Sequence, residues 1–204
     1  MTYQIDRYPA ELIDVVHLLH ERVVIRPVLP QDEDLTGAFF GDLSATARHQ
    51  RFLAPMRWLP PGLTKRLTQV DYQNHMALVA EVFRDGGERV IAEARYARLG
   101  DGSSAELAIS VAEPWQGLGL ARLLLAKLMC RAAAAGIERL VGETLASNQR
   151  MIGLARKAGF TVKRSPELGG VLLIEAILGD GTRQARLAAI TPCLANLEAT
   201  PTAA

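Results

Sequence analysis

The residues best suited to chemistry lie where an expected strand meets an expected helix. Gly117, Gly119 and Ala121 follow a strand-like segment over residues 105–111 and open a long apolar stretch. Small residues let the backbone approach a ligand closely, and the first N–H groups of a helix have no partner within the helix. Those donors and the helix dipole together favour an anion such as a pyrophosphate. A glycine turn with only a structural role is the alternative, so the surrounding pattern has to decide.

Two other glycine loops that bind phosphate do not fit this segment. A P-loop ends in Gly-Lys followed by Ser or Thr, and that ending is missing here. The dinucleotide fingerprint needs the spacing G-x-G-x-x-G and an acidic residue about 20 positions further on, within a βαβ unit. Neither condition is met, which disfavours both nucleotide-binding folds.

A carboxylate stands on the strand that precedes the glycines. Apolar side chains alternate onto one face of residues 105–111, and Glu106 shares the other face with two small residues, Ala108 and Ser110. A charged residue beside small ones suggests the wall of a cavity. A carboxylate there could accept a proton from an amine, directly or through one water. The alternatives are a solvated Glu106 on an outward face and Glu143, on the next strand, as the base.

The expected elements describe one mixed sheet with helices around it. The pattern predicts strands at residues 23–25, 76–83, 89–98, 105–111, 140–145, 160–163 and 171–177, and helices at 32–43, 44–52, 63–70, 117–135 and 148–158. Three consecutive strands form an antiparallel meander in the centre. This order predicts an α/β (α+β) fold on a mostly antiparallel sheet flanked by helices, and not a doubly wound one.

Composition narrows the class of protein. The chain has 204 residues, 49% of them hydrophobic and 22% charged, with a formal net charge of +1. This is typical of a globular protein with a full core, and it predicts no attraction for nucleic acid or an anionic membrane. Charged residues interrupt the first twenty positions, so no signal peptide is expected, and the expected location is cytoplasmic.

No metal site is expected. Two cysteines are too few for a disulfide framework, and no Cys or His spacing matches a metal site. These residues are expected to be ordinary core or surface residues: Cys130, Cys193, His17, His20, His49 and His75.

Two segments resemble motifs of the GNAT superfamily of N-acetyltransferases. Residues 116–121 (Gln-Gly-Leu-Gly-Leu-Ala) resemble its acyl-CoA pyrophosphate motif, Gln/Arg-x-x-Gly-x-Gly/Ala. Residues 148–160 resemble its closing helix, with asparagine at the start and Gly-Phe at the end. Further segments, at 48–52, 68–80 and 105–111, resemble the catalytic domain of bacterial protein lysine acetyltransferases.

The resemblance divides the chain into three parts. It covers residues 23–178 as a GNAT domain. Residues 1–22 are then expected to be an N-terminal extension and residues 179–204 a C-terminal tail, both without an assigned role.

The resemblance implies transfer of an acetyl group from acetyl-CoA to an amine, most simply a protein lysine side chain, without a metal. Glu106 would be the general base, and the backbone N–H of Val111 would stabilise the oxyanion. The pantetheine arm would pair with the backbone of β-strand residues, main-chain N–H groups would hold the pyrophosphate, and an asparagine would lie near the reacting end. The implied acetyl-CoA-binding residues are Ile109, Val111, Gln116, Gly117, Leu118, Gly119, Leu120, Ala121 and Asn148.

One position departs from the wider family. Many GNAT enzymes carry a tyrosine after the leucine of the closing helix, where it protonates the departing thiolate, but Ala155 follows Leu154 here. A thiolate with a pKa of about 8.5 is a tolerable leaving group without help. Tyr72 and Tyr96 are the candidate substitutes.

Two other functions stay open at this stage. One is acetylation of a small amine, although the basic stretch over residues 44–71 weakly disfavours a cationic substrate. The other is an acyl-CoA sensor without catalysis. The acceptor, the preferred acyl chain and the oligomeric state are not predicted.

Overall fold

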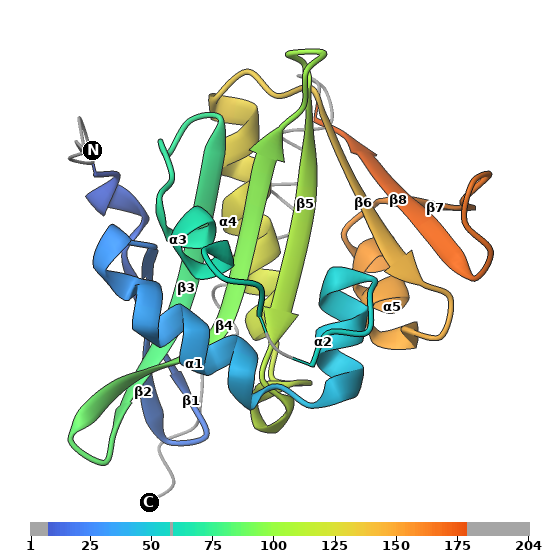
Figure 1. Cartoon of the computed structure of the whole chain (residues 1–204). Helices are drawn as coiled ribbons and strands as arrows, with labels where there is room; N and C mark the ends of the chain where they lie inside the picture. The colour runs from blue at the N-terminus through green and yellow to red at the C-terminus, as the bar shows by residue number, and fades with distance from the viewer. Residues whose placement is uncertain (1–7, 58, 179–204) are drawn as a thin grey trace, which may run out of the picture.

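The computed structural model describes residues 8–57 and 59–178 (Figure 1). The strands are β1 (Asp14–Leu18), β2 (Glu21–Pro27), β3 (His75–Arg84), β4 (Gly87–Arg98), β5 (Ser104–Val111), β6 (Arg139–Leu145), β7 (Thr161–Arg164) and β8 (Val171–Ile177). The helices are α1 (Glu33–Asp42), α2 (Ala45–Phe52), α3 (Leu63–Thr68), α4 (Leu120–Ala134) and α5 (Gln149–Lys157), with short 3-10 turns η1 (Ala10–Leu12), η2 (Pro30–Asp32) and η3 (Glu113–Trp115).

All eight strands form one sheet in the order β1-β2-β3-β4-β5-β6-β8-β7. Every pairing is antiparallel except the one between β5 and β6. This mixed, mostly antiparallel sheet confirms the predicted fold class.

The two parallel strands stay together only briefly. The pairing of β5 with β6 extends from Ser104 to Glu106, after which the strands diverge (Figure 1). At the point of divergence a Cβ on Gly142 would lie 3.0 Å from the carbonyl oxygen of Leu107. A residue without a side chain therefore allows the closest approach of β5 and β6, just before the gap opens.

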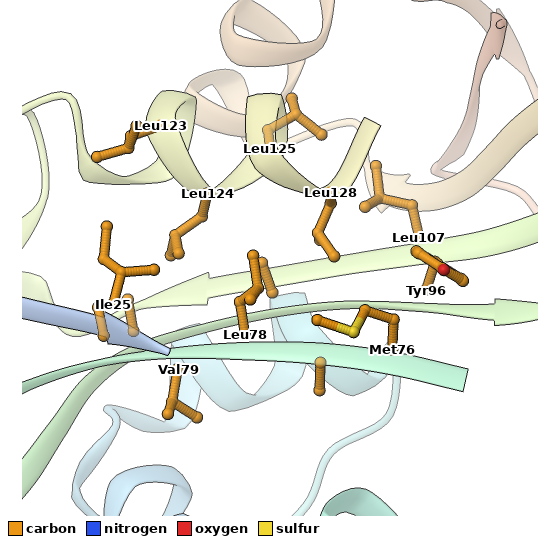
Figure 2. Packing of buried hydrophobic residues seen from close by; sticks show 14 of the residues in the cluster. Ile25, Met76, Leu78, Val79, Tyr96, Leu107, Leu123, Leu124, Leu125 and Leu128 are labelled. Atoms are coloured by element: carbon orange, nitrogen blue, oxygen red, sulfur yellow. The ribbon is translucent and has the colours of Figure 1, made fainter. Parts of the chain in front are cut away.

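Helices cover both faces of the sheet. α4 packs on one face of β3, β4 and β5, and α1 and α2 pack on the other (Figure 1). Figure 2 shows Leu124 and Leu128 of α4 above Leu78 and Tyr96 of the sheet, with Val79 pointing to the opposite face. This packing fixes β5, whose C-terminal end forms part of the candidate site.

The predicted strands and helices are present, with two informative differences. β1 was not predicted, because Leu19 and His20 form its turn to β2 with positive φ angles of 50° and 65°, without the glycine or asparagine that usually marks such a turn. β1 therefore adds a sheet strand within the segment expected to be an extension. α4 begins at Leu120 and not at residue 117, because two glycines precede it in the left-handed conformation.

No helix in the described part of the chain is long and apolar enough to cross a membrane. Among residues 8–57 and 59–178, no group of three or more His, Cys, Asp or Glu side chains could hold a metal ion. Cys130 lies half-buried on α4, whereas Cys193 and the tail lie outside the described residues.

Candidate active site

A pocket of about 810 Å³ opens where β5 and β6 diverge. Its walls are formed by α2, the end of β5, the turn before α4, and α5. The volume lies within the range of about 300–1,000 Å³ that is usual for sites of small molecules and cofactors. The gap in the sheet thus becomes a binding site whose walls come from four separate elements.

The backbone of β5 is available on the pocket side. Ala112 N–H donates to the carbonyl of Ile91 at 2.8 Å, so these two residues form a hydrogen-bonded pair across β4 and β5. Hydrogen-bonded pairs alternate along an antiparallel ladder. The N–H and C=O groups of Ile109 and Val111 therefore point away from β4, toward the gap, and both residues line the pocket.

The glycine turn before α4 also faces the pocket. Gly117 and Gly119 have φ angles of 81° and 87°, which a residue with a side chain adopts only with strain. Gly119 is the N-cap of α4 and has no side chain with which to cap this helix, so the N–H groups of Leu120 and Ala121 have no partner within the helix. The side chain of Leu120 is buried in the core and that of Leu118 packs against the core. Only the main chain of these two leucines is available to a phosphate.

Positive charge surrounds this end of the pocket. Arg122 on α4 and Arg150 and Lys157 on α5 line it. The one acidic lining residue in the described part of the chain is Glu113, whose carboxylate accepts a hydrogen bond from Ser44 N–H at 3.2 Å. Burial alone would raise the pKa of Glu113, but the hydrogen bonds from Ser44 and the charge of Arg150 lower it. The arrangement suits an anionic ligand.

Two polar side chains of the predicted motifs are used within the protein. Gln116 Nε2 donates to the carbonyl of Val111 at 2.8 Å, and its Oε1 accepts from Arg150. The Gln116 side chain thereby joins the end of β5 to α5. Asn148 Oδ1 caps α5 by accepting from Met151 N–H at 3.1 Å. Gln116 and Asn148 both line the pocket.

The two candidate bases lie outside the pocket lining. Glu106 is exposed at the start of β5, opposite Ala97 on β4 and Val141 on β6. It shares a face of the sheet with Ser110, which does line the pocket. Glu143 is exposed on β6, on the same face as Val141 and therefore as Glu106. Both carboxylates thus flank the gap on the face that α2 covers.

The two tyrosines considered as acids are engaged elsewhere. Tyr96 donates to the carbonyl of Gln73 at 3.0 Å, and burial raises its pKa to about 12. Tyr72 donates to the carbonyl of Val28 at 2.8 Å. Neither lines the pocket, so the structure does not support either of these candidates as a replacement for the missing tyrosine. Ala155 itself is fully buried.

Residues 43–160 match the profile of the acetyltransferase (GNAT) family. The chain belongs to this family. Acetyltransferase PA5475 of Pseudomonas aeruginosa is 34% identical over 145 residues, which cover 71% of this chain and 78% of that protein. Acetyltransferase Pat of Mycolicibacterium smegmatis is 31% identical over 149 residues, or 72% of this chain, but these cover only 44% of Pat.

Solved structures give the same result. The GNAT domain of S. lividans PAT superimposes with a TM-score of 0.76 at 30% identity, covering 84% of this chain and 99% of that domain. The protein yncA from Salmonella typhimurium, solved with its cofactor acetyl-CoA, superimposes with a TM-score of 0.63 at 21% identity, covering 78% of this chain and 95% of that one. At this lower identity the likeness is one of fold.

One group of residues in this GNAT domain was not anticipated. Arg95 on β4 is buried and its Nε contacts Glu93 Oε1, while Arg51 NH2 of α2 lies 3.6 Å from Glu93 Oε2. Arg95 NH1 also lies 2.9 Å from Nε2 of His75. Because a guanidinium only donates, Nε2 accepts and the ring is neutral. Burial first, and then the charge of Arg95, lower the pKa of His75 to about 4.

The sequence contained a signal for this group. Glu93 and Arg95 are charged residues two apart within the otherwise mostly apolar residues 90–97 of a strand, so their side chains share one face. Arg51 belongs to the basic stretch over residues 44–71, yet its side chain is only 11% exposed. The placement of its side chain against Glu93 depends on how α2 packs on the sheet, which a single sequence does not reveal.

Proposed function

We propose that this GNAT domain transfers the acetyl group of acetyl-CoA to the side-chain amine of a protein lysine. The observation that carries the proposal is a pocket that combines the backbone edge of β5 at Ile109 and Val111, which faces away from β4, with the glycine turn of Gly117 and Gly119. An extended ligand arm pairs with a free strand edge, and a pyrophosphate suits the N-terminus of a helix. The basic residues Arg122, Arg150 and Lys157 add charge complementary to phosphates.

We assign the general base to Glu106. A lysine amine has a pKa of about 10.4 and must lose a proton before it can attack. An acceptor that enters on the α2-facing side of β5 passes the exposed carboxylate of Glu106. A base often comes within hydrogen-bonding distance only once the substrate is bound, and one water can carry the proton.

The proposed reaction is a direct transfer. The neutral amine nitrogen attacks the thioester carbonyl carbon, and Glu106 takes the amine proton. The backbone N–H of Val111, which faces the gap, would donate to the oxyanion of the tetrahedral intermediate. The C–S bond then breaks, the amide remains on the acceptor, and the thiolate of coenzyme A leaves and takes a proton from water.

A protein acceptor is favoured by two observations. The segments at residues 48–52, 68–80 and 105–111 resemble bacterial protein lysine acetyltransferases, and the chain is similar to Pat and to the GNAT domain of PAT. A small amine as acceptor and a sensor without catalysis are the functions against which the proposal is tested.

The test follows thiol release from acetyl-CoA with a lysine-rich protein extract and with a panel of small amines. Glu106→Gln is compared with Glu143→Gln, a matched change of an exposed glutamate on the same face of the next strand. We expect release with the extract, lost in Glu106→Gln and retained in Glu143→Gln, while both variants bind acetyl-CoA. If only small amines react, the acceptor is a small amine and not a protein lysine. If acetyl-CoA binds but no acceptor reacts, the protein is a sensor and not an enzyme.

A further inference from the structure

Helix α2, the wall of the pocket on the proposed acceptor side, is attached to the rest of the protein by little apolar packing. α2 contributes Ala47, Gln50 and Arg51 to the pocket lining, yet none of its eight residues is fully buried. Most helices are stabilised by packing an apolar face. α2 packs only Phe52 and Ala47, both partly buried, against the core. Polar contacts must therefore supply much of its attachment.

Two arginines provide these polar contacts. Arg48 donates to the carbonyl of Gly41 at 2.7 Å and also to that of Leu43, which ties α2 back to the end of α1. Arg51 reaches the sheet itself, through Glu93 on β4. Its guanidinium also lies 4.9 Å from the ring centre of Phe52. Arg51 is thus the residue of α2 that joins the helix to the sheet by an ion pair.

The ion pair belongs to what we call the basic network: Arg51, Glu93 and Arg95. Glu93 lies directly opposite Ser110 of β5, whose side chain lines the pocket from the same face. Among the described residues, Arg51 Nε, Glu93 Oε2 and Ser110 Oγ are buried without a hydrogen-bond partner. A buried polar network that is only partly satisfied holds its elements less firmly than a complete one.

We propose that Arg51 is a positioning residue, which sets the place of α2, and with it the acceptor side of the pocket, through its ion pair with Glu93. The glycine turn and the basic side chains proposed to hold the phosphates belong to the start of α4 and to α5, and not to α2. Glu106, Ala108 and Ser110 of β5 share the face of the sheet that bears Glu93, the partner of Arg51. Because α2 contacts both β5 and β6, its position borders the space that an amine on this face would enter. The part of this inference that concerns the acceptor rests on the proposed function.

The structure contains a matched control at a distance from the pocket. The acidic network consists of Arg26, Asp32 and Glu81, all largely buried. Arg51→Met removes one of two arginines that share a carboxylate, and Glu81→Gln removes one of two carboxylates that share an arginine. Each change leaves one buried ion pair intact and brings the net charge of its network to zero. Neither change therefore leaves a buried charge without a partner.

The first experiment compares hydrogen exchange of the α2 amides in the wild type, Arg51→Met, Arg51→Lys and Glu81→Gln. We expect faster exchange of residues 45–52 in Arg51→Met, partial protection in Arg51→Lys, and wild-type exchange in Glu81→Gln. Unchanged exchange of α2 in Arg51→Met, or equal acceleration in Glu81→Gln, would overturn the role of Arg51. This readout needs no turnover, so it is independent of whether the proposed function holds.

The second experiment measures initial rates with the acceptor varied. Misplacing a substrate wall by about 1 Å lowers rates by as much as 100-fold. We expect Arg51→Met to raise KM for the acceptor and to lower kcat/KM by about tenfold or more, while the affinity for acetyl-CoA changes by less than about threefold. Arg51→Lys should recover part of the loss. An unchanged acceptor KM, or an equal loss of affinity for acetyl-CoA, would contradict the placement of Arg51 on the acceptor side.

Discussion

Two buried charge networks join this sheet to neighbouring elements. They differ in the sign of their net charge and in how fully their polar atoms are hydrogen-bonded. In the acidic network, Arg26 donates to both oxygens of Asp32 at 2.6 and 3.0 Å and to both oxygens of Glu81 at 3.0 Å. Leu29 N–H adds a bond of 2.7 Å to Asp32. In the basic network, two arginines share Glu93, and Arg51 Nε and Glu93 Oε2 have no hydrogen-bond partner among the described residues.

The difference follows from what each network joins. The acidic network ties β2, β3 and the turn η2, which contain no residue of the pocket lining. The basic network lies directly beneath α2 and beside Ser110, at the pocket wall. We therefore expect the acidic network to act mainly on the stability of the fold and the basic network to act also on the place of α2 at the pocket wall.

Arg26→Met should give the largest loss of stability. The change leaves Asp32 and Glu81 buried together without a cation, and breaking a buried ion pair in this way costs about 3–5 kcal/mol. Equilibrium unfolding in urea measures the loss. The folded fraction should keep its activity per molecule. If Arg51→Met costs as much, the two networks are equivalent for stability and the comparison fails.

Glu93→Gln should lower both stability and activity. The two guanidinium groups lose their shared carboxylate, but Arg51 reaches the pocket surface, so we expect a cost of about 3 kcal/mol, the lower end of the range for a buried pair. α2 also loses its attachment to β4, so acceptor turnover should fall as well. Urea unfolding and initial rates separate the two effects. Activity equal to that of Glu81→Gln would argue against a link between the basic network and the pocket.

The basic network should also respond to acid through His75. Its pKa is about 4 in the folded protein, whereas an ordinary histidine titrates near 6.5. Between these values the unfolded chain binds more protons than the folded one, so stability rises with pH over this window and is fully present above about 6.5. The full shift corresponds to at most about 3 kcal/mol, and solvent screening of this partly exposed ring reduces it.

His75→Gln tests this pH dependence, because a glutamine oxygen still accepts from Arg95 but does not titrate. Urea midpoints at pH 5 and pH 7.5 should differ less in the variant than in the wild type. An identical difference in both proteins would assign the acid response to other groups.

Gly119→Ala changes the pocket without touching either network. At a φ of 87° an alanine costs about 1–2 kcal/mol in the folded state, because its Cβ crowds the following carbonyl. The strain also moves the N–H groups that start α4, so affinity for acetyl-CoA should fall. Gly86→Ala, at a φ of 77° in the β3–β4 turn, is the matched control. Equal affinities for acetyl-CoA in the two variants would argue against phosphate binding at the glycine turn.

Much of the fold could be predicted because local patterns carry it. Gly86 marks the turn of the central hairpin, Gly136 follows the end of α4, and Asn148 caps α5 as expected. β1 was missed because its turn uses Leu19 and His20, which give no turn signal. The start of α4 was placed too early because helical periodicity does not show that Gly117 and Gly119 are left-handed.

From the sequence, site residues could be predicted only within a single strand, turn or helix. Ile109, Val111 and the glycines all line the pocket, since alternation and helix-start chemistry act within a few residues. The bridge from Gln116 to Arg150 and the pair of Arg51 with Glu93 join residues 34 and 42 positions apart. Such contacts depend on how α2 and α5 pack on the sheet. No local pattern in one sequence encodes that packing.

The most direct test of the account is mass spectrometry of a lysine-containing acceptor protein after incubation with acetyl-CoA and the enzyme. The account predicts acetyl groups on lysine side chains with the wild type and with Glu143→Gln, and a rate at least about 100-fold lower with Glu106→Gln, as expected for loss of a general base. Equal rates for the wild type and Glu106→Gln would contradict the assigned base. No acetylated lysine with the wild type, despite binding of acetyl-CoA, would contradict the proposed function.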